Sequence, residues 1–194
     1  TLEEASGARH EIDLRRGTPV AARTNVASLG LIAWLAASGR LDDAGRRRAE
    51  AAGGDPLEAL FRLGLLAPAT AWEHLAAHGR AVLERALAAE DGTFRWEPDA
   101  AAPPGAFPLG DPWALLCACG RRIPPETVAR RLGARIDCPV MRAGDGLVPV
   151  ERLGLNAHET RVVAALDGTR SLAMLAAAAP AEAATIYRTG LFLA

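Results

Sequence analysis

The longest uninterrupted helical pattern of the chain runs from Trp72 to Leu87, and it constrains the fold more than any other stretch. Apolar residues recur there at three- and four-residue steps with charged residues between them, as in a helix that buries one face. We expect Trp72 and Leu83 in the core and Arg80 and Glu84 at the surface. The other elements in the first half of the chain should pack on this helix.

Shorter helical patterns precede the long helix, and each is closed by a glycine. The apolar set around Phe61 ends at Gly64, and an earlier set over residues 29–35 leads to Gly39. Glycine ends helices because it adopts the left-handed conformation without steric cost. A further helix is expected over residues 43–52. Two such units are too few for a solenoid, so the pattern indicates a small helical bundle.

Residues 10–23 have the pattern of a β-hairpin. Ile12 and Leu14 alternate with charged residues, and Arg16-Gly17 supplies the turn. An isolated two-stranded hairpin is marginally stable in water, so this one needs neighbouring strands or helices. Residues 94–96, in which two aromatic side chains flank an arginine, could add a strand to the same sheet. The fold class predicted is therefore α+β, mainly α, with a small antiparallel sheet on a helical bundle.

A stretch rich in alanine, proline and glycine separates the two halves of the chain. It predicts a linker over residues 101–111, between a domain of residues 1–100 and a helical subdomain of residues 112–194. In the second part, Cys138–Met141 and Leu147–Val150 flank a turn-rich spacer, which suggests a second hairpin.

The last part of the chain predicts three short helices joined by tight turns. This arrangement is winged-helix-like, and its candidate recognition helix is Ala181–Thr189. That helix offers Glu182 and Arg188 among alanines, whereas base and phosphate contacts would call for arginine, asparagine, glutamine or lysine. The segment is better suited to packing against protein.

Composition excludes several classes of function. All 22 basic residues are arginine, so a phosphate-binding loop with its lysine and a Schiff-base lysine are both absent. A formal charge of −1 gives no electrostatic reason to expect nucleic acid or a membrane as partner. Three cysteines and no signal or membrane-length apolar run predict a cytoplasmic protein with reduced thiols.

No constellation typical of catalysis or metal binding is apparent. His74 and His78 lie one helical turn apart but lack an obvious third ligand, and Leu75 stands where the metalloprotease motif has glutamate. Cys117 and Cys119 have one residue between them, which on a helix points the two thiols apart. We therefore expect no cofactor, no metal and no enzymatic activity.

The most concentrated charge is the run Arg46, Arg47 and Arg48, which is the candidate partner-binding site. Three consecutive helical residues spread over about 300° of the helix, so they form a collar rather than one patch. A solvated helix surface is the alternative interpretation.

The order of these pieces resembles the PATAN domain, named after the N-terminus of PatA. The resemblance covers roughly residues 8–98 and rests on the segments Arg16–Arg23, Gly39–Leu41, Leu63–Leu66 and Gly92–Trp96. PATAN domains are bacterial signalling modules without known catalysis, and some are thought to act through protein contacts with type IV pili and motility machinery. The family has a helix and a strand before the hairpin, so the resemblance implies an N-terminally truncated domain.

These observations predict a non-catalytic signalling or adaptor module that acts through a protein partner. One alternative is a DNA-associated transcriptional regulator that uses the C-terminal helices. Another is a cyclic-dinucleotide sensor, although the Leu-Gly repeat of such domains fits poorly here because Gly39 comes two residues too late after Leu29-Gly30. If the hairpin over residues 10–23 normally pairs with an earlier strand, its open edge favours a homodimer, unless residues 94–96 shield it.

Overall fold

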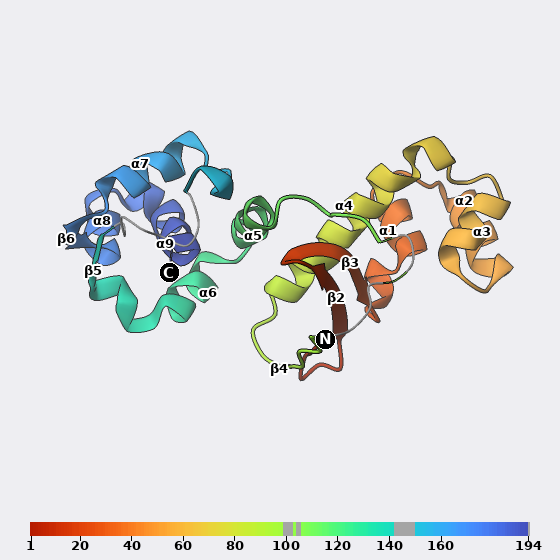
Figure 1. Ribbon diagram of the computed structural model, residues 1–194, viewed down its shortest axis with the longest axis horizontal. Coiled ribbons are helices and arrows are strands. Elements are labelled where there is room, and N and C mark those ends of the chain that lie inside the picture. The colour runs from red at the N-terminus through yellow and green to blue at the C-terminus, as the bar shows by residue number, and fades with distance from the viewer. Residues whose placement is uncertain (99–102, 104–105, 142–149, 194) are drawn as a thin grey trace. The chain divides into compact units, whose positions relative to one another are not determined.

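The computed structural model describes residues 1–98, 103, 106–141 and 150–193, and it has an α+β, mainly α architecture (Figure 1). The chain divides into two compact units, Thr1–Gly110 (unit 1) and Asp111–Ala194 (unit 2). The predicted fold class, a small antiparallel sheet combined with many helices, is confirmed.

Unit 1 is a four-stranded antiparallel sheet packed on helices, with strand order β3-β2-β1-β4. Its strands are β1 (Leu2–Glu3), β2 (Arg9–Arg15), β3 (Thr18–Thr24) and β4 (Thr93–Phe94). Its helices are η1 (Ala27–Leu29), α1 (Leu31–Ala37), α2 (Asp43–Ala52), α3 (Pro56–Arg62) and α4 (Pro68–Leu87). The hairpin of β2 and β3 turns at Arg16 and Gly17, both with positive φ, which fits the twist of the flanking strands.

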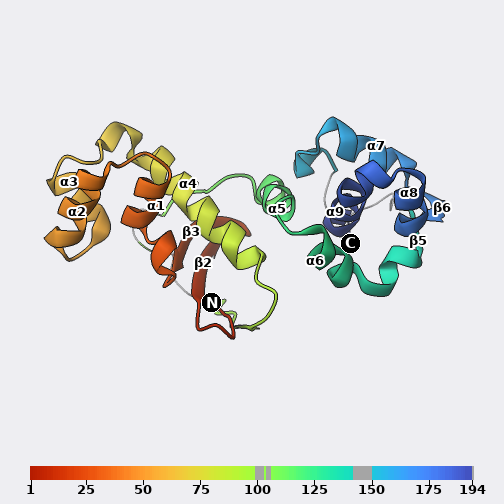
Figure 2. The same cartoon turned by 180° about the vertical axis from the view of Figure 1, so that it is seen from behind.

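The long helix α4 joins the two parts of unit 1, as both ribbon views show (Figures 1 and 2). It begins with Pro68 at its first turn, where the missing N–H costs no hydrogen bond. Its buried face includes Val82 and Leu83 and contacts β2 and β3. Its first turn contributes Ala71 to a separate cluster formed by α1, α2 and α3, with Leu35 and Leu60 at its centre.

The prediction that Trp72 lies in the core is wrong. Its side chain is 59% exposed, whereas Leu83 is 4% exposed as predicted. The helical spacing places Trp72 on the same side of α4 as Leu83. In the first turn of α4, however, the residue that packs in the core is Ala71, which lies about 100° away around the helix axis. Periodicity cannot show that the packing partner, and with it the buried face, changes along one helix.

Arg80 was predicted to be exposed and is instead half-buried. Its guanidinium donates a 3.0 Å hydrogen bond to the carbonyl oxygen of Leu109. Leu109 is buried against Gly79, where an added Cβ would lie 2.8 Å from a Leu109 methyl carbon. The described end of the expected linker 101–111 is therefore part of the unit 1 core. Glu84 is also half-buried rather than exposed.

The sheet has one face toward α4 and one charged face. His10, Val20 and Ala22 are buried, whereas the other face carries a ladder of ion pairs. In that ladder Arg9 lies 2.7 Å from Glu11, and Arg23 lies 3.1 Å from Asp13. This alternation is the period-two pattern that predicted the hairpin.

Unit 2 is a helical unit around α9, which contacts α5, α6, α7 and α8. Its helices are α5 (Pro112–Gly120), α6 (Pro125–Leu132), η2 (Gly133–Asp137), η3 (Val150–Leu153), α7 (Ala157–Ala165), α8 (Leu172–Ala178), η4 (Pro180–Glu182) and α9 (Ala183–Leu193). Its strands are β5 (Pro139–Met141) and β6 (Asp167–Ser171), which pair antiparallel. Its C-terminal part has the order α7, β6, α8 and α9.

The second arm of the predicted second hairpin, Leu147–Val150, lies outside the described residues except for Val150. Val150 begins η3. The first arm, Cys138–Met141, contributes β5, but β5 pairs with the later strand β6. A strand of three residues pairs with whatever edge the tertiary fold presents, and neighbouring sequence does not reveal that edge.

The two faces of α4 can be compared by truncating one buried and one exposed side chain. We expect Leu83→Ala to lower the free energy of unfolding by about 2–5 kcal/mol, because it leaves a cavity between α4 and the sheet. Trp72→Ala removes a larger side chain but should cost less than about 1 kcal/mol. Urea unfolding of both variants measures this difference. Equal losses would contradict the assignment of the buried face.

Candidate functional site

The arginine run predicted to bind a partner lies on α2, and its members differ. Arg46 is half-buried and lies 3.0 Å from Glu50 and 3.7 Å from Asp43. Arg47 and Arg48 are exposed, and neither forms an ion pair with another described residue. The run therefore supplies two available guanidinium groups rather than three.

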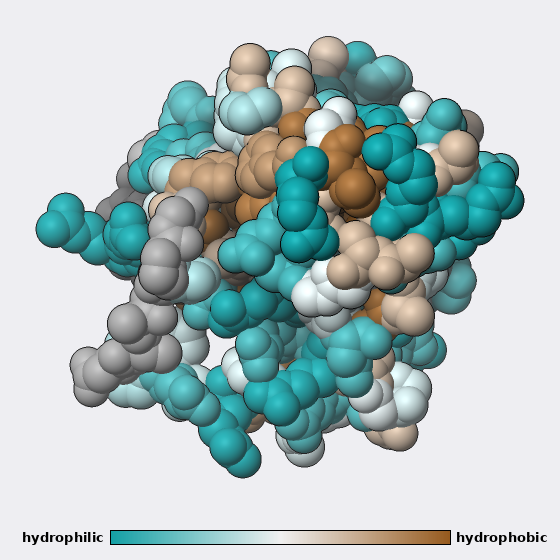
Figure 3. Space-filling view, turned by 90° about the vertical axis from the view of Figure 1, so that its right-hand side faces the viewer, coloured by the Kyte–Doolittle hydropathy of each residue, from teal (hydrophilic) through white to brown (hydrophobic). Residues whose placement is uncertain are grey.

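Next to α2, the surface of unit 1 is apolar. We call this the α1–α3 surface, and it consists of half-buried or exposed apolar side chains from α1, α3 and the connection to α4. They are Leu31, Ile32, Leu57, Phe61, Leu63 and Leu65. Figure 3 faces this end of the unit and shows hydrophobic residues gathered between hydrophilic ones. Phe61, 38% exposed, is the largest of the six.

Two of the carboxylates around this surface, Asp42 and Asp55, cap the helices, whereas Glu58 on α3 is exposed. Asp42 accepts a 2.7 Å hydrogen bond from the backbone N–H of Gly45 at the start of α2. Asp55 accepts two hydrogen bonds from the first turn of α3. Such capping carboxylates satisfy backbone N–H groups that have no partner within the helix. The border therefore presents Arg47 and Arg48 on α2 and Glu58 on α3 to solvent.

The histidines considered for metal binding have structural surroundings. His78 Nε2 lies 2.7 Å from the carbonyl oxygen of Leu29, and its ring packs edge-on against Trp34. Burial lowers the pKa of His78, and the Leu29 carbonyl opposes this shift. Arg40 covers Trp34 at 4.8 Å. Within the described residues, no group of three or more potential ligands is placed to hold a metal ion.

Unit 1 contains one strongly shielded charge network, at the junction of sheet and helix. The Glu4 side chain, almost fully buried, lies 2.7 Å from Arg85 Nη2 on α4 and 2.9 Å from His10 Nε2 on β2. The hydrogen bond from Arg85 lowers the pKa of Glu4, burial opposes it, and His10 adds to the lowering. A carboxylate held by these two side chains links three elements and is not positioned to act on a substrate.

Unit 2 has a corresponding network. Arg121, at the end of α5, donates two 2.7 Å hydrogen bonds to the carboxylate of Glu159 on α7 and one to the carbonyl oxygen of Gly154. Glu159 also accepts a hydrogen bond from the backbone N–H of Asn156, which completes a capping box. Burial alone would raise the pKa of Glu159, but the bonds from Arg121 and Asn156 outweigh it and lower the pKa.

The cysteines of unit 2 do not form a reactive or metal-binding group. Cys117 and Cys119 are buried, and Cys138 is exposed. Burial raises the pKa of Cys117 to about 11, which keeps its thiol protonated and unreactive.

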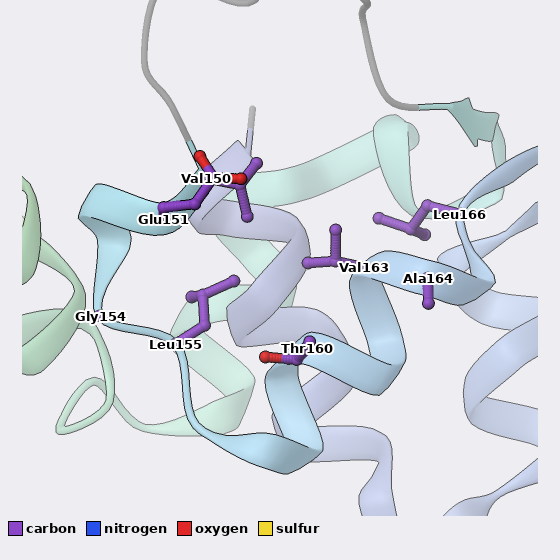
Figure 4. Close-up of a pocket in the computed structure, with 8 residues that line it drawn as sticks. All are labelled: Val150, Glu151, Gly154, Leu155, Thr160, Val163, Ala164 and Leu166. Atoms are coloured by element: carbon purple, nitrogen blue, oxygen red, sulfur yellow. The ribbon is translucent and has the colours of Figure 1, made fainter.

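A groove in unit 2 lies between η3 and α7 (Figure 4). Its volume is about 520 Å³, and its walls are mainly the aliphatic side chains of Val150, Leu155, Val163, Ala164 and Leu166. Thr160 also faces it, but the hydroxyl of Thr160 already donates to the carbonyl oxygen of Asn156. Glu151 is the one ionisable side chain among the described lining residues, and the aliphatic walls can take apolar groups by excluding water from them.

The candidate recognition helix is the central helix of unit 2. Ile186, Thr189 and Gly190 of α9 are buried, and Arg188 donates to the carbonyl oxygen of Ile123 through Nε and Nη2. A helix that enters the DNA major groove must present a free face. The packing of α9 therefore weighs against the DNA-associated alternative.

In comparisons with known proteins, no family model, no curated protein and no solved structure matches the chain. The resemblance to the PATAN domain therefore remains a resemblance. No helix among the described residues has the length and apolar character needed to cross a membrane.

The Arg121–Glu159 network predicts a pH-dependent stability. Because the folded-state pKa of Glu159 lies below its ordinary value of 4.5, its stabilising contribution is present above about pH 4.5 and is lost as the pH falls through the folded-state value. Glu159→Gln should destabilise α7 by about 1–3 kcal/mol at pH 7. The difference from wild type should shrink below pH 4.5, where the wild-type carboxylate is protonated too.

Hydrogen exchange of peptides covering α7, measured across urea concentrations at each pH, follows this difference. A gap between wild type and Glu159→Gln that stays constant from pH 7 to pH 3 would contradict the ionic role of Glu159.

Proposed function

We propose that this chain is a non-catalytic adaptor module that binds a protein partner through the α1–α3 surface. The observation that supports it best is that five of these apolar side chains pack on one small core without being fully buried, and that the exposed Phe61 lies one helical turn after Leu57 on α3. Contiguous exposed apolar surface costs solubility and marks protein contacts. Aromatic side chains with arginines nearby are the residue types that most often anchor such contacts.

The charges bordering this surface define the chemistry of the partner. Arg47 and Arg48 are exposed on α2, and Arg62 is exposed at the end of α3. The neighbouring Asp42 and Asp55 are turned into helix caps. A partner segment that combines apolar anchors with acidic residues would satisfy both features. An amphipathic helix with an acidic border is the simplest segment of this kind.

The arrangement of the buried charges supports a binding rather than a catalytic role. Glu4 and Glu159, the two most shielded carboxylates, each form an ion pair with an arginine that joins separate elements. Catalytic acids and bases need access to a substrate and a pKa near the working pH. Both carboxylates have a pKa below the usual range and are enclosed.

The resemblance to PATAN domains extends this proposal to a biological setting. We place the module in bacterial signalling, in the cytoplasm, with regulation of motility or type IV pili as its field of action. The reduced cysteines expected from the sequence fit that compartment.

The proposal can be tested by placing a photo-crosslinking amino acid at position 61 in the native host and identifying the adduct. The partner found in the adduct is then purified. Its binding to wild type and to three variants of this chain is measured by calorimetry. Phe61→Ser and the double variant Arg47→Glu/Arg48→Glu should each weaken binding at least about tenfold. The matched control Arg15→Glu reverses an exposed charge on β2 and should leave the affinity unchanged.

Two results would contradict the proposal. The first is equal affinity of wild type and the three variants for every crosslinked protein. The second is a specific interaction of another class: a DNA shift that survives physiological salt, or saturable binding of a cyclic dinucleotide.

A further inference from the structure

The outer edge of β4 is the feature of unit 1 that the proposed function does not use. On its inner side, β4 pairs with β1 in the register Leu2 opposite Phe94 and Glu3 opposite Thr93. The next pair is closed by two hydrogen bonds, from Thr1 N to Arg95 O at 2.9 Å and from Arg95 N to Thr1 O at 2.8 Å. Residues 93–95 therefore follow one antiparallel ladder.

The backbone groups of Phe94 point away from that ladder. In an antiparallel pair, the residues next to a hydrogen-bonded pair direct their N–H and C=O groups to the opposite side. No other described strand pairs there. The side chains at this edge are apolar as well, because Phe94 is 82% exposed and Trp96 is 63% exposed. An edge with free backbone groups and exposed aromatics is a template for another strand.

The two other candidate edges of the sheet are each interrupted at one point. The part of β2 beyond β1 has a register shift between Asp13 and Leu14, and such irregularities and charged side chains prevent strand addition. At the outer edge of β3, the carbonyl oxygen of Pro19 accepts a 2.9 Å hydrogen bond from the N–H of Leu109. The sequence predicts an open edge at the hairpin. In the structure β1 pairs with β2 and β4 pairs with β1, so the open edge is that of β4.

We propose that a second copy of this chain pairs antiparallel with β4 across a two-fold axis, with Phe94 opposite Phe94 of the second copy. A two-fold axis presents the same strand to itself, so one short strand supplies both halves of the contact. The pairing would join two four-stranded sheets. It would also place two exposed aromatic rings side by side, an arrangement that stabilises strand pairs.

The register follows from charge and size. With Phe94 at the axis, Arg95 lies opposite Thr93 of the second copy and diagonal to Asp91. Trp96 then lies opposite Gly92, which has no side chain because Glu3 O approaches it closely. A shift of the axis to Arg95 would set two arginines directly opposite each other, and like charges in that position destabilise a strand pair. In the first register the two arginines are diagonal rather than directly opposite, and the other diagonal of Arg95 is Asp91, whose Oδ1 also accepts a 3.3 Å hydrogen bond from Ala5 N.

This inference is independent of the α1–α3 surface, since it concerns the sheet and not the helices α1 to α3. Binding of an outside partner and self-association can therefore fail separately. The occupant is a second copy rather than an unrelated strand because the complementary groups, Phe94, Arg95, Asp91 and Gly92, all lie on this one segment.

Disulfide trapping tests the register in the whole chain. In a Cys138→Ser background, which removes the exposed native thiol, chains with Thr93→Cys are mixed with tagged chains carrying Arg95→Cys and are gently oxidised. Both variants keep Phe94 and Trp96. We expect the mixed Thr93→Cys/Arg95→Cys dimer to predominate, because facing residues of an antiparallel pair meet the distance that a disulfide requires. Predominance of the Arg95→Cys homodimer would overturn the register.

Light scattering over a concentration series tests the association itself. Phe94→Lys should weaken self-association at least about tenfold and abolish the disulfide product, because it introduces a like charge at the axis. Trp72→Lys, at another exposed aromatic residue, should leave both unchanged. The proposal would be overturned if the wild-type chain stays monomeric and the Thr93→Cys and Arg95→Cys chains give no more disulfide product than the same chains carrying Phe94→Lys. Equal effects of both lysine variants would do the same.

Discussion

The ion pair between Glu4 and Arg85 is the interaction on which the arrangement of unit 1 depends. Glu4 follows β1, Arg85 lies near the end of α4, and His10 of β2 contacts the same carboxylate. A buried carboxylate is costly unless a charged partner and hydrogen bonds satisfy it. The pair can therefore form only when β1, β2 and α4 are together, and this requirement fixes how the sheet lies on the helix.

Unit 2 follows the same rule with different elements. Glu159 at the start of α7 is held by Arg121 from the end of α5 and by the backbone of its own helix. In both units a shielded carboxylate joins segments that are far apart in the sequence, by 81 residues for Glu4 and Arg85 and 38 for Arg121 and Glu159. The most enclosed charges thus serve the fold.

Much of the fold could be predicted from the sequence because its signals are local. The helix around Leu83, the hairpin turn at Arg16 and the helix end at Gly39 each depend on residues within a few positions. β1 could not be predicted, since two residues carry no periodicity. The pairing of β5 with β6 and the packing of Leu109 on Gly79 also escaped prediction. These contacts depend on the tertiary arrangement, which overrides local preference.

The candidate site was predictable only in part. The sequence identified the arginine run, but it could not distinguish Arg46, which pairs with Asp43 and Glu50, from Arg47 and Arg48, which are exposed. The α1–α3 surface could not be predicted from the sequence for a related reason. Helical periodicity marks Leu57 and Phe61 as apolar positions, and it does not say that the core beside them is too small to cover them fully.

The central claim, that enclosed ion pairs hold the elements of the fold together, is tested most directly by a double-mutant cycle on Glu4 and Arg85. The free energy of unfolding is measured for wild type, Glu4→Gln, Arg85→Met and the double variant. We predict a coupling energy of roughly 1–3 kcal/mol, with the double variant less destabilised than the sum of the single ones. A coupling energy near zero would show that the pair does not hold the sheet on α4 and would contradict the account.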